Sequence, residues 1–250
     1  MLAQHISEVE WQARCELAAL YRLMAHFRMT DLIDTHISMR VPNEPNHFLI
    51  NRYGILFDQM KASDLVKIDH DGHIVEAYDE GKNVNVAGFV IHSAIHHARP
   101  EIHCVIHTHT ADGIAVSTQK DGLAFISQHA MKFYNRIAYH DFEGVATDLD
   151  ERERLVADLG DKRTMILRNH GLLAAGISTH QAFHDMFFLE RACQIQVKAL
   201  SMGGQMTWPS PEVCEHTAQQ FDEEDHPEYV KMAFEAALTL IATQKADYCS

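Results

Sequence analysis

The amino-acid sequence predicts an α/β domain over residues 1–205, with a helical extension of the same domain over residues 206–250. Segments with the apolar spacing of amphipathic helices alternate with short runs rich in β-branched residues, which is typical of this class. No repeat, low-complexity tract or strong linker interrupts them. A chain of 250 residues is also long enough to bury roughly two-thirds to three-quarters of its unfolded surface without disulfides.

Helices are predicted where apolar residues recur every three or four positions. The first covers residues 7–28, and Ser7 and Glu10 at its start resemble a capping box. A second covers residues 86–98 and ends before Arg99-Pro100, as helices do ahead of proline. A long helix over residues 179–200 ends at a glycine pair. The remaining predicted helices cover residues 111–119, 148–159 and 227–243.

Strands are predicted in the short apolar or alternating segments between these helices. A pair at 35–42 and 47–51 is joined by a turn that contains Asn43. Residues 65–76 are predicted to form two strands around Asp71-Gly72, a favourable hairpin turn. Further strands are predicted at residues 103–110, 125–128, 136–142 and 164–169. The acidic run 221–228 is predicted to be a solvated linker into the last helix.

Charge and cysteine content narrow the partners and the location. Asp and Glu number 35 against 21 Lys and Arg, so the formal charge is −14, the wrong sign for neutralising phosphates across a broad face. Nucleic acid is therefore not expected as a partner. The five cysteines are far apart and form no Cys-x-x-Cys pair, which favours the reducing cytoplasm. Neither a secretion signal nor a membrane-spanning run is recognised, so no membrane partner is expected.

The most specific chemical pattern is a pair of histidines on one predicted strand. Side chains alternate across a strand, so His107 and His109 project from the same face and could chelate one cation. His170 stands at the end of another apolar strand, where Gly171 permits a sharp turn. Three neutral imidazoles suit zinc first, and also manganese, iron or cobalt, with positions left for water or a substrate oxygen. The alternatives are a structural His-x-His pair and a His170 that only caps a turn.

Five stretches of the chain occur in a familiar order and at familiar intervals: LAALYRLMAHF, THISMRVP, HFLINRYGILFDQMKASDLVKID, NVAGFVIHSAIHHARPEIHCVIHTHT and MILRNHGLLAAG. Together they resemble the class II aldolase/adducin family over about residues 7–200, nearer its adducin-like branch than the sugar-phosphate aldolases. The resemblance implies a three-layer α/β/α fold with a central mixed or antiparallel sheet. It also implies a cyclic homotetramer with sites at subunit interfaces, and a divalent metal held by His107, His109 and His170.

Two departures from the family pattern bear on the reaction. Where the aldolases have Ser-Ser-Glu, with the glutamate transferring a proton, this chain has Val86-Ala87-Gly88. Losing a general base commonly costs about 10²- to 10⁴-fold in rate. The aldolase phosphate-binding segments are replaced by Thr35-His36 and by residues 51–54, so a phosphorylated sugar is less expected. Within that loop, Arg52 either pairs with a carboxylate or phosphate oxygen or faces solvent.

Histidines on the predicted helix 86–98 are candidates to replace the missing base. Gly88, His92 and His96 share one helix face, so His92 could reach the substrate from the side that the glutamate would have used. The alternative is a hydrogen-bonded core histidine. His36 is a candidate substrate-binding residue, and His129 and Tyr134 are weaker catalytic candidates.

Two functions are compatible with these sequence features. The first is a metal-dependent carbon–carbon lyase, of decarboxylase or aldolase type, in which the ion polarises a carbonyl or enolate oxygen of a small hydroxy-carbonyl or carboxylate compound. Decarboxylation needs no base to remove a carbon-bound proton, so it tolerates the loss at Gly88 better. The alternative is a non-catalytic, adducin-like oligomerising or interaction module that retains metal binding.

Overall fold

A seven-stranded mixed sheet forms the centre of the computed structural model, which describes residues 6–144 and 150–250. The strand order is β3-β2-β1-β4-β7-β6-β5, and every neighbouring pair is antiparallel except β5 and β6. The strands are β1 (His36–Val41), β2 (Glu44–Ile50), β3 (Val66–Asp69), β4 (Cys104–Thr108), β5 (Ile137–His140), β6 (Thr164–Leu167) and β7 (Gly171–Gly176). The predicted α/β class with a mixed sheet is confirmed.

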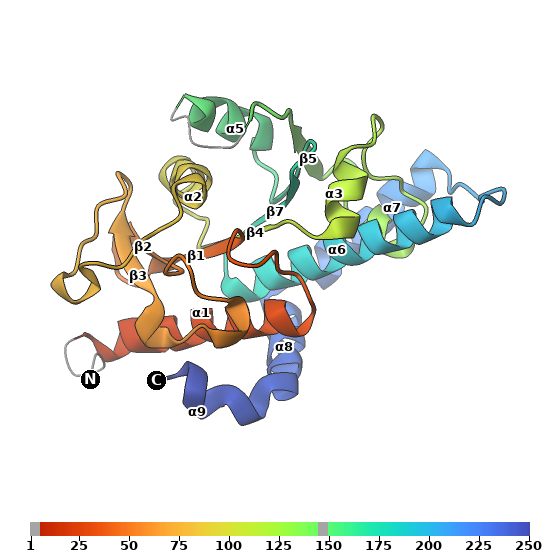
Figure 1. Cartoon of the computed structure of the whole chain (residues 1–250). Coiled ribbons are helices and arrows are strands. Elements are labelled where there is room, and N and C mark those ends of the chain that lie inside the picture. The colour runs from red at the N-terminus through yellow and green to blue at the C-terminus, as the bar shows by residue number, and fades with distance from the viewer. Residues whose placement is uncertain (1–5, 145–149) are drawn as a thin grey trace.

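Helices cover both faces of the sheet. Figure 1 shows α1 (Glu8–His26) and α6 (Thr179–Ser201) below it, and α2 (Val86–Ala98) and α5 (Glu151–Leu159) above it. The other helices are α3 (Ala111–Ser117), α4 (Gln128–Met131), α7 (Pro211–Glu224), α8 (Pro227–Leu238) and α9 (Lys245–Tyr248). Short 3₁₀ helices cover Phe57–Gln59, Ala62–Asp64, Ala77–Asp79 and Thr239–Gln244. Within the two described ranges, no helix is both long and apolar enough to cross a bilayer.

Alternation along β1 sorts its side chains between the two faces. Ile37, Met39 and Val41 lie in the core that the sheet shares with α1 and α6. Since successive residues of a strand point to opposite faces, the intervening His36 and Ser38 face α2. They are nevertheless buried. The helix α2 therefore packs over a row of polar side chains, a feature that becomes important at the candidate site.

The predicted helices begin and end close to the predicted positions. The hydroxyl of Ser7 accepts a hydrogen bond from the backbone N–H of Glu10 at 3.1 Å, so it caps α1 as expected. The Glu10 carboxylate does not complete a capping box, because it binds Arg14 instead. α2 covers the predicted residues 86–98. α5 begins at Glu151, and residues 148–149 of its predicted range lie outside the described part of the chain.

Two strand predictions were wrong and one strand was missed. Residues 125–128 form no strand, because Ser127 caps α4 and the Phe125 ring packs on Tyr134. The segment after Asp71-Gly72 contributes only an isolated bridge between Ile68 and Ile74. The missed strand is β7, which lies between β4 and β6. Its composition, Gly-Leu-Leu-Ala-Ala-Gly, lacks the β-branched residues on which strand prediction depends.

The acidic run at 221–228 is mostly exposed to solvent, as predicted, but it is not a linker. Most of it belongs to the end of α7 and the start of α8, and α7 begins where the Ser210 hydroxyl accepts a hydrogen bond from the N–H of Val213. Asp225 follows α7, and its side chain is 5% exposed. Its carboxylate binds the ammonium group of Lys132. The prediction failed because a buried ion pair between segments 93 residues apart leaves no local pattern.

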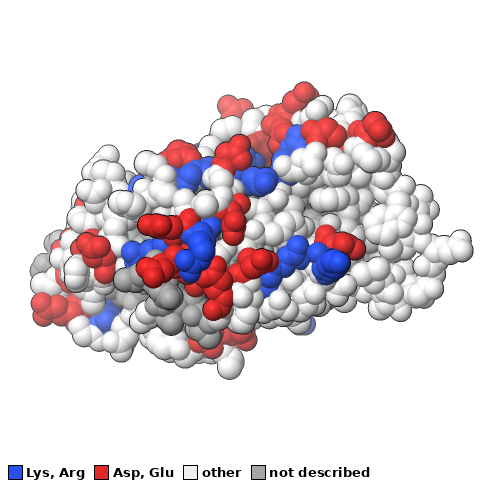
Figure 2. Space-filling view, turned by 90° about the horizontal axis from the view of Figure 1, so that it is seen from above, with Lys and Arg blue, Asp and Glu red and all other residues white. Residues whose placement is uncertain are grey.

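The surface agrees with the acidic composition. Figure 2 looks onto the molecule from the side of α2 and α5, and Lys and Arg there occur singly or in small groups among Asp and Glu. Such a face does not present the continuous positive surface by which proteins neutralise nucleic-acid phosphates.

Candidate metal centre

Three histidines from two parts of the sheet meet at one point. His107 lies in β4, His109 directly follows it, and His170 lies in the loop between β6 and β7. Their Nε2 atoms are 2.8 Å apart for His107 and His109, 3.0 Å for His109 and His170, and 3.3 Å for His107 and His170. The rings therefore point toward a common centre, from residues up to 63 positions apart in sequence.

The loop that carries His170 depends on two small backbone adjustments. Asn169 has a φ of 57°, a left-handed conformation that asparagine tolerates. Gly171 opens β7, and a Cβ atom there would lie 2.2 Å from the carbonyl oxygen of Thr108 in β4. The glycine is thus required for the close approach of β7 to β4, while the asparagine makes the turn.

The second ring nitrogens of two of these histidines are held by fixed acceptors. His107 Nδ1 lies 2.9 Å from the Leu172 carbonyl oxygen, and His109 Nδ1 lies 3.2 Å from a carboxylate oxygen of Asp31. Each of these nitrogens must donate its proton, so a neutral ring keeps a lone pair on Nε2. Acceptors of this kind orient the histidine ligands of metal sites. His107 and His109 therefore direct two lone pairs toward the same centre.

Burial keeps two of the three histidines, His107 and His170, uncharged. The pKa of His107 is held well below its usual value, mainly by burial and further by the neighbouring His170, His36 and His109. For His170, burial and then the nearby His109 and His140 lower the pKa to about 4. These two imidazoles are therefore neutral at physiological pH, which is the form that binds metal ions.

The arrangement fits a divalent cation. A tetrahedral zinc ion at about 2.0–2.1 Å from each nitrogen would set the nitrogens roughly 3.3 Å apart, close to the three distances here. Without a cation, one N–H from His170 could satisfy only one of the lone pairs of His107 and His109. Three neutral imidazoles that leave coordination positions open are typical of catalytic rather than structural sites.

His36 and His92 lie beside this cluster in a defined order. His36 pairs with His107 across the β1–β4 ladder, and their ring centroids are 4.9 Å apart. His92, on α2, is fully buried and lies 2.8 Å, Nε2 to Nδ1, from His36. The ring next to the cluster is thus His36. His92 hydrogen-bonds to Nδ1 of that ring from α2, whereas the sequence predicted that His92 itself reaches the substrate.

Gly88 explains how His36 fits in this position. A Cβ atom at residue 88 would lie 2.7 Å from Cδ2 and 2.8 Å from Cγ of the His36 ring. Real Cβ atoms rarely approach other atoms so closely, so the His36 ring occupies space that any side chain at position 88 would need. The glycine that replaces the family glutamate and the histidine beside it therefore depend on each other.

The remaining sequence candidates lie in other surroundings. Arg52 is exposed in the loop after β2 and makes no ion pair within the described ranges. Tyr134 packs edge-on against Phe125, and the His129 ring stacks on Phe188 at 5.2 Å between centroids. Both residues are partly buried and their rings make aromatic contacts.

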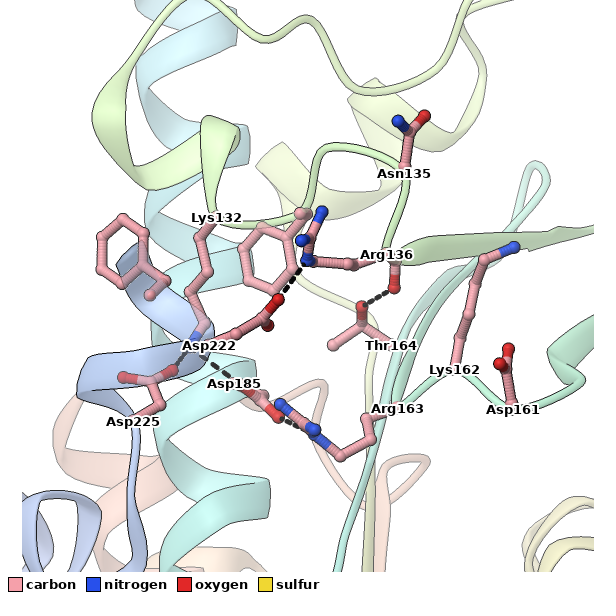
Figure 3. A pocket seen from close by; sticks show the side chains of 12 residues that line it. Lys132, Asn135, Arg136, Asp161, Lys162, Arg163, Thr164, Asp185, Asp222 and Asp225 are labelled. Carbon is pink, nitrogen blue, oxygen red and sulfur yellow. Dashed lines mark hydrogen bonds and ion pairs between the residues drawn. The ribbon is translucent and has the colours of Figure 1, made fainter. Parts of the chain in front are cut away.

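A second group of metal-ligating residues lies in a separate cavity of about 190 Å³, which does not border the three histidines. Figure 3 shows Lys132 reaching between Asp185 and Asp225 there. The Lys132 nitrogen is 3.1 Å from Asp185 and 3.4 Å from Nδ1 of His184. The guanidinium group of Arg163 also lies 3.1 Å from Asp185, so two positive charges balance the two carboxylates. The cluster is therefore an internal ion-pair network that fastens α7 to α6.

Several residues that support the site were not predicted from the sequence. Asp31 is 78 positions from the histidine that it orients, and Leu172 contributes only a backbone carbonyl. Ser38 and Arg40 share the α2-facing side of β1 with His36, so alternation of polar residues in the sequence HISMRV could have pointed to them.

Known proteins share this fold and much of this sequence. Residues 15–197 match the family described as "Class II Aldolase and Adducin N-terminal domain". An aldolase II superfamily protein from Pseudomonas syringae is 50% identical with a TM-score of 0.92, over 99% of this chain and 98% of that one. An L-fuculose 1-phosphate aldolase from Glaciozyma antarctica is 30% identical with a TM-score of 0.83, over 96% and 92%. Alpha-adducin from Rattus norvegicus is 44% identical over 192 residues, which are 76% of this chain and 26% of the adducin.

Proposed function

The chain belongs to the class II aldolase and adducin family, and we propose that it is a divalent-metal-dependent carbon–carbon lyase acting on a small hydroxy-carbonyl or carboxylate compound. The observation that carries the proposal is the convergence of His107, His109 and His170, two of them held with their Nε2 lone pairs inward. A divalent ion bound there supplies a Lewis acid that stabilises negative charge on a carbonyl oxygen. Zinc is the first candidate, followed by manganese, iron or cobalt.

Decarboxylation, or a retro-aldol step that needs no carboxylate base at position 88, fits this chain best. Gly88 has no group that could take a proton from carbon, and the His36 ring fills the adjacent space. Decarboxylation breaks the bond to the carboxylate carbon and releases carbon dioxide, which leaves an electron pair on the substrate. That electron pair must be stabilised, but no proton has to be removed from carbon first. The exposed guanidinium of Arg52 is available to pair with a substrate carboxylate.

The oligomeric state and the cellular location in this proposal are inferred from the family resemblance. We infer a cytoplasmic homotetramer with a small-molecule substrate at each site. The half-exposed Phe142 supports the placement of the site at a subunit interface. Its ring lies 6.3 Å from that of His170, so it presents an apolar surface beside the site that a neighbouring subunit could cover. Light scattering is expected to give a mass close to four times the 28.4 kDa of one chain.

Metal analysis tests the proposal directly. Protein stripped with a chelator and reloaded with zinc is expected to hold about one ion per chain. His107→Ala and His170→Ala are expected to lose it. His216→Ala is the matched control, because His216 is an exposed histidine on α7 that belongs to no group of potential metal ligands among the described residues. Equal metal content in all four proteins would remove the basis of the proposal. The loaded protein is then assayed for aldehyde and carbon dioxide release from a panel of hydroxy-carbonyl and keto-carboxylate compounds.

A second candidate is a non-catalytic interaction module that retains the ion. The similarity to alpha-adducin and the glycine at position 88 favour it. Absence of turnover across the panel by fully metal-loaded protein, together with an unchanged tetramer mass in the His107→Ala variant, would support this alternative over the lyase.

A further inference from the structure

A buried network of four polar side chains connects α2 to the candidate metal centre. His36 and Ser38 come from β1, and His92 and His96 come from one face of α2. The contacts are 2.8 Å between His36 Nδ1 and His92 Nε2, 2.5 Å between His92 Nδ1 and Ser38 Oγ, and 2.7 Å between Ser38 Oγ and His96 Nε2. All four side chains are at most 2% exposed, so water does not compete for these bonds.

The number of protons in this network limits how it can be arranged. Burial lowers the pKa of His92 and His96 well below the usual value, so each of these two rings is neutral and carries one N–H and one lone pair. A bond between two neutral rings uses the N–H of one and the lone pair of the other. The bonds must then run in one direction along the network. If both His92 and His96 donated to Ser38, the buried hydroxyl proton would lack an acceptor in the network, which is costly.

Arg40 selects between the two directions. Its Nη2 donates to the His96 carbonyl oxygen at 2.7 Å and lies 3.5 Å from His96 Nδ1. A guanidinium group carries only donors, so this contact calls for the lone pair of His96 on Nδ1 and its proton on Nε2. The carbonyl oxygen of Ile102, the other acceptor near this ring, already accepts a hydrogen bond from Nε of Arg40 at 3.2 Å. His96 then donates to Ser38, Ser38 donates to His92, and His92 donates to Nδ1 of His36. The last ring is left with its proton on Nε2.

The Nε2 atom of His36 lies in the space beside Gly88. A Cβ atom at residue 88 would be 3.2 Å from it, and the ring itself packs against His107. In residues 6–144 and 150–250, no group accepts a hydrogen bond from this nitrogen. The site therefore has a donor next to the histidine cluster with no acceptor from the described protein.

We propose that His36 is a ligand-recognition residue whose Nε2–H donates a hydrogen bond to an oxygen acceptor beside the three histidines, and that Arg40, His96, Ser38 and His92 are positioning residues that fix this tautomer. The inference deepens the proposed function by naming a ligand class. A carbonyl, carboxylate or enolate oxygen accepts such a bond, whereas an ammonium group or a second N–H does not. With its proton on Nε2, His36 neither accepts a proton there nor competes as a metal ligand.

Nitrogen-15 NMR of the full-length protein tests the tautomer without any metal. Long-range proton–nitrogen correlation spectra distinguish the two neutral forms, and His36→Phe identifies the His36 signals. In the apo protein His36, His92 and His96 are expected to carry the proton on Nε2. Ser38→Ala is expected to leave His96 unchanged and to give mixed tautomers at His92 and His36. A proton on Nδ1 of His36 in the wild-type spectrum overturns the proposal, whatever the variants do.

Ser93→Ala is the matched control for Ser38→Ala. Ser93 is also buried, but its hydroxyl donates to the Val90 carbonyl oxygen within α2 and lies outside the network. It is expected to leave all three tautomers unchanged. Equal spectra for Ser38→Ala and Ser93→Ala would show that the network does not set the tautomer.

Calorimetry with zinc-loaded protein tests the ligand class, with oxalate as the oxygen-acceptor probe and imidazole as a probe that offers no oxygen. His36→Phe keeps a flat ring and removes the donor. Its affinity for oxalate is expected to be about 10- to 100-fold weaker, the value of a hydrogen bond to a charged group, at unchanged zinc content and similar imidazole affinity. Equal oxalate affinity at equal zinc content refutes the donor role. Failure of the wild type to bind zinc counts against the proposed function alone, since the NMR result stands without metal.

Discussion

Substituting Gly88 by alanine tests how tightly His36 is held against α2. In most helices this change stabilises the protein by up to about 1 kcal/mol, because glycine is a poor helix former. Here the new Cβ would lie 2.7 Å and 2.8 Å from two carbon atoms of the His36 ring, compared with about 3.5–4.0 Å for an ordinary contact. Overpacking of this kind costs about 1–3 kcal/mol. We expect the cost to exceed the gain.

The His36 ring has little freedom to relieve the clash. Its Nδ1 is hydrogen-bonded to His92 at 2.8 Å, and its other side packs on His107. In a His36→Ala background the obstacle is gone, so Gly88→Ala is expected to become stabilising. The coupling energy between the two positions is then the clash itself, about 1–3 kcal/mol.

Thermal unfolding of the four proteins of this double-mutant cycle measures the coupling, at one fixed concentration because an oligomer's transition depends on it. Each kcal/mol corresponds to roughly 2–4 °C for a chain of this size. If Gly88→Ala raises the transition temperature by the same amount in both backgrounds, the two residues are not coupled and the reasoning is wrong. If they are coupled, restoring a glutamate at position 88 requires a smaller residue at position 36.

Three further predictions concern the surroundings of the site. Asp31→Ala is expected to weaken zinc binding about 10- to 100-fold by releasing His109, as measured by competition with a chromogenic chelator; unchanged affinity would mean that the carboxylate does not orient the ring. Because burial lowers the pKa of His92 and His96, the unfolded chain takes up protons below about pH 6.5 that the folded chain does not. The free energy of unfolding of metal-free protein should therefore fall with decreasing pH, by up to about 1.4 kcal/mol per pH unit for each of these histidines, and a flat urea-denaturation profile from pH 7 to 5 would contradict this. Lys132→Met removes the ammonium partner of the buried Asp225 carboxylate, while Asp185 keeps Arg163, and is expected to destabilise the fold by about 3–5 kcal/mol in the same assay; a loss below about 1 kcal/mol would show that the ion pair is dispensable.

Sequence alone predicted those parts of the fold that depend on local periodicity. The helices α1, α2 and α6 have repeating apolar positions and clear end signals, and they occur where they were expected. The convergence of His107 and His109 follows from strand alternation in the same way. β7 and α7 were missed because one is built from glycine, leucine and alanine and the other is mostly polar, so neither has the composition typical of its class.

The surroundings of the histidines required the tertiary structure. The alternation His36, Ser38, Arg40 on β1 and the i, i+4 pair His92 and His96 on α2 are both visible in the sequence. Nothing local indicates that the two rows face each other, because that depends on how α2 packs on the sheet. The sequence therefore pointed to His92 as the group nearest the substrate, whereas in the structure the ring that packs on His107 is His36, with His92 bound to it.

The antiparallel ladder between β1 and β4 sets His36 opposite His107. Inserting or deleting one residue within β1 would exchange the faces of every side chain beyond that point. Histidine, serine and arginine would then enter the apolar layer beneath the sheet, and Ile37 and Met39 would face α2. The spacing of this short strand is consequently as much a part of the candidate site as its histidines are, and we expect length changes in natural and engineered variants to fall in the connecting loops.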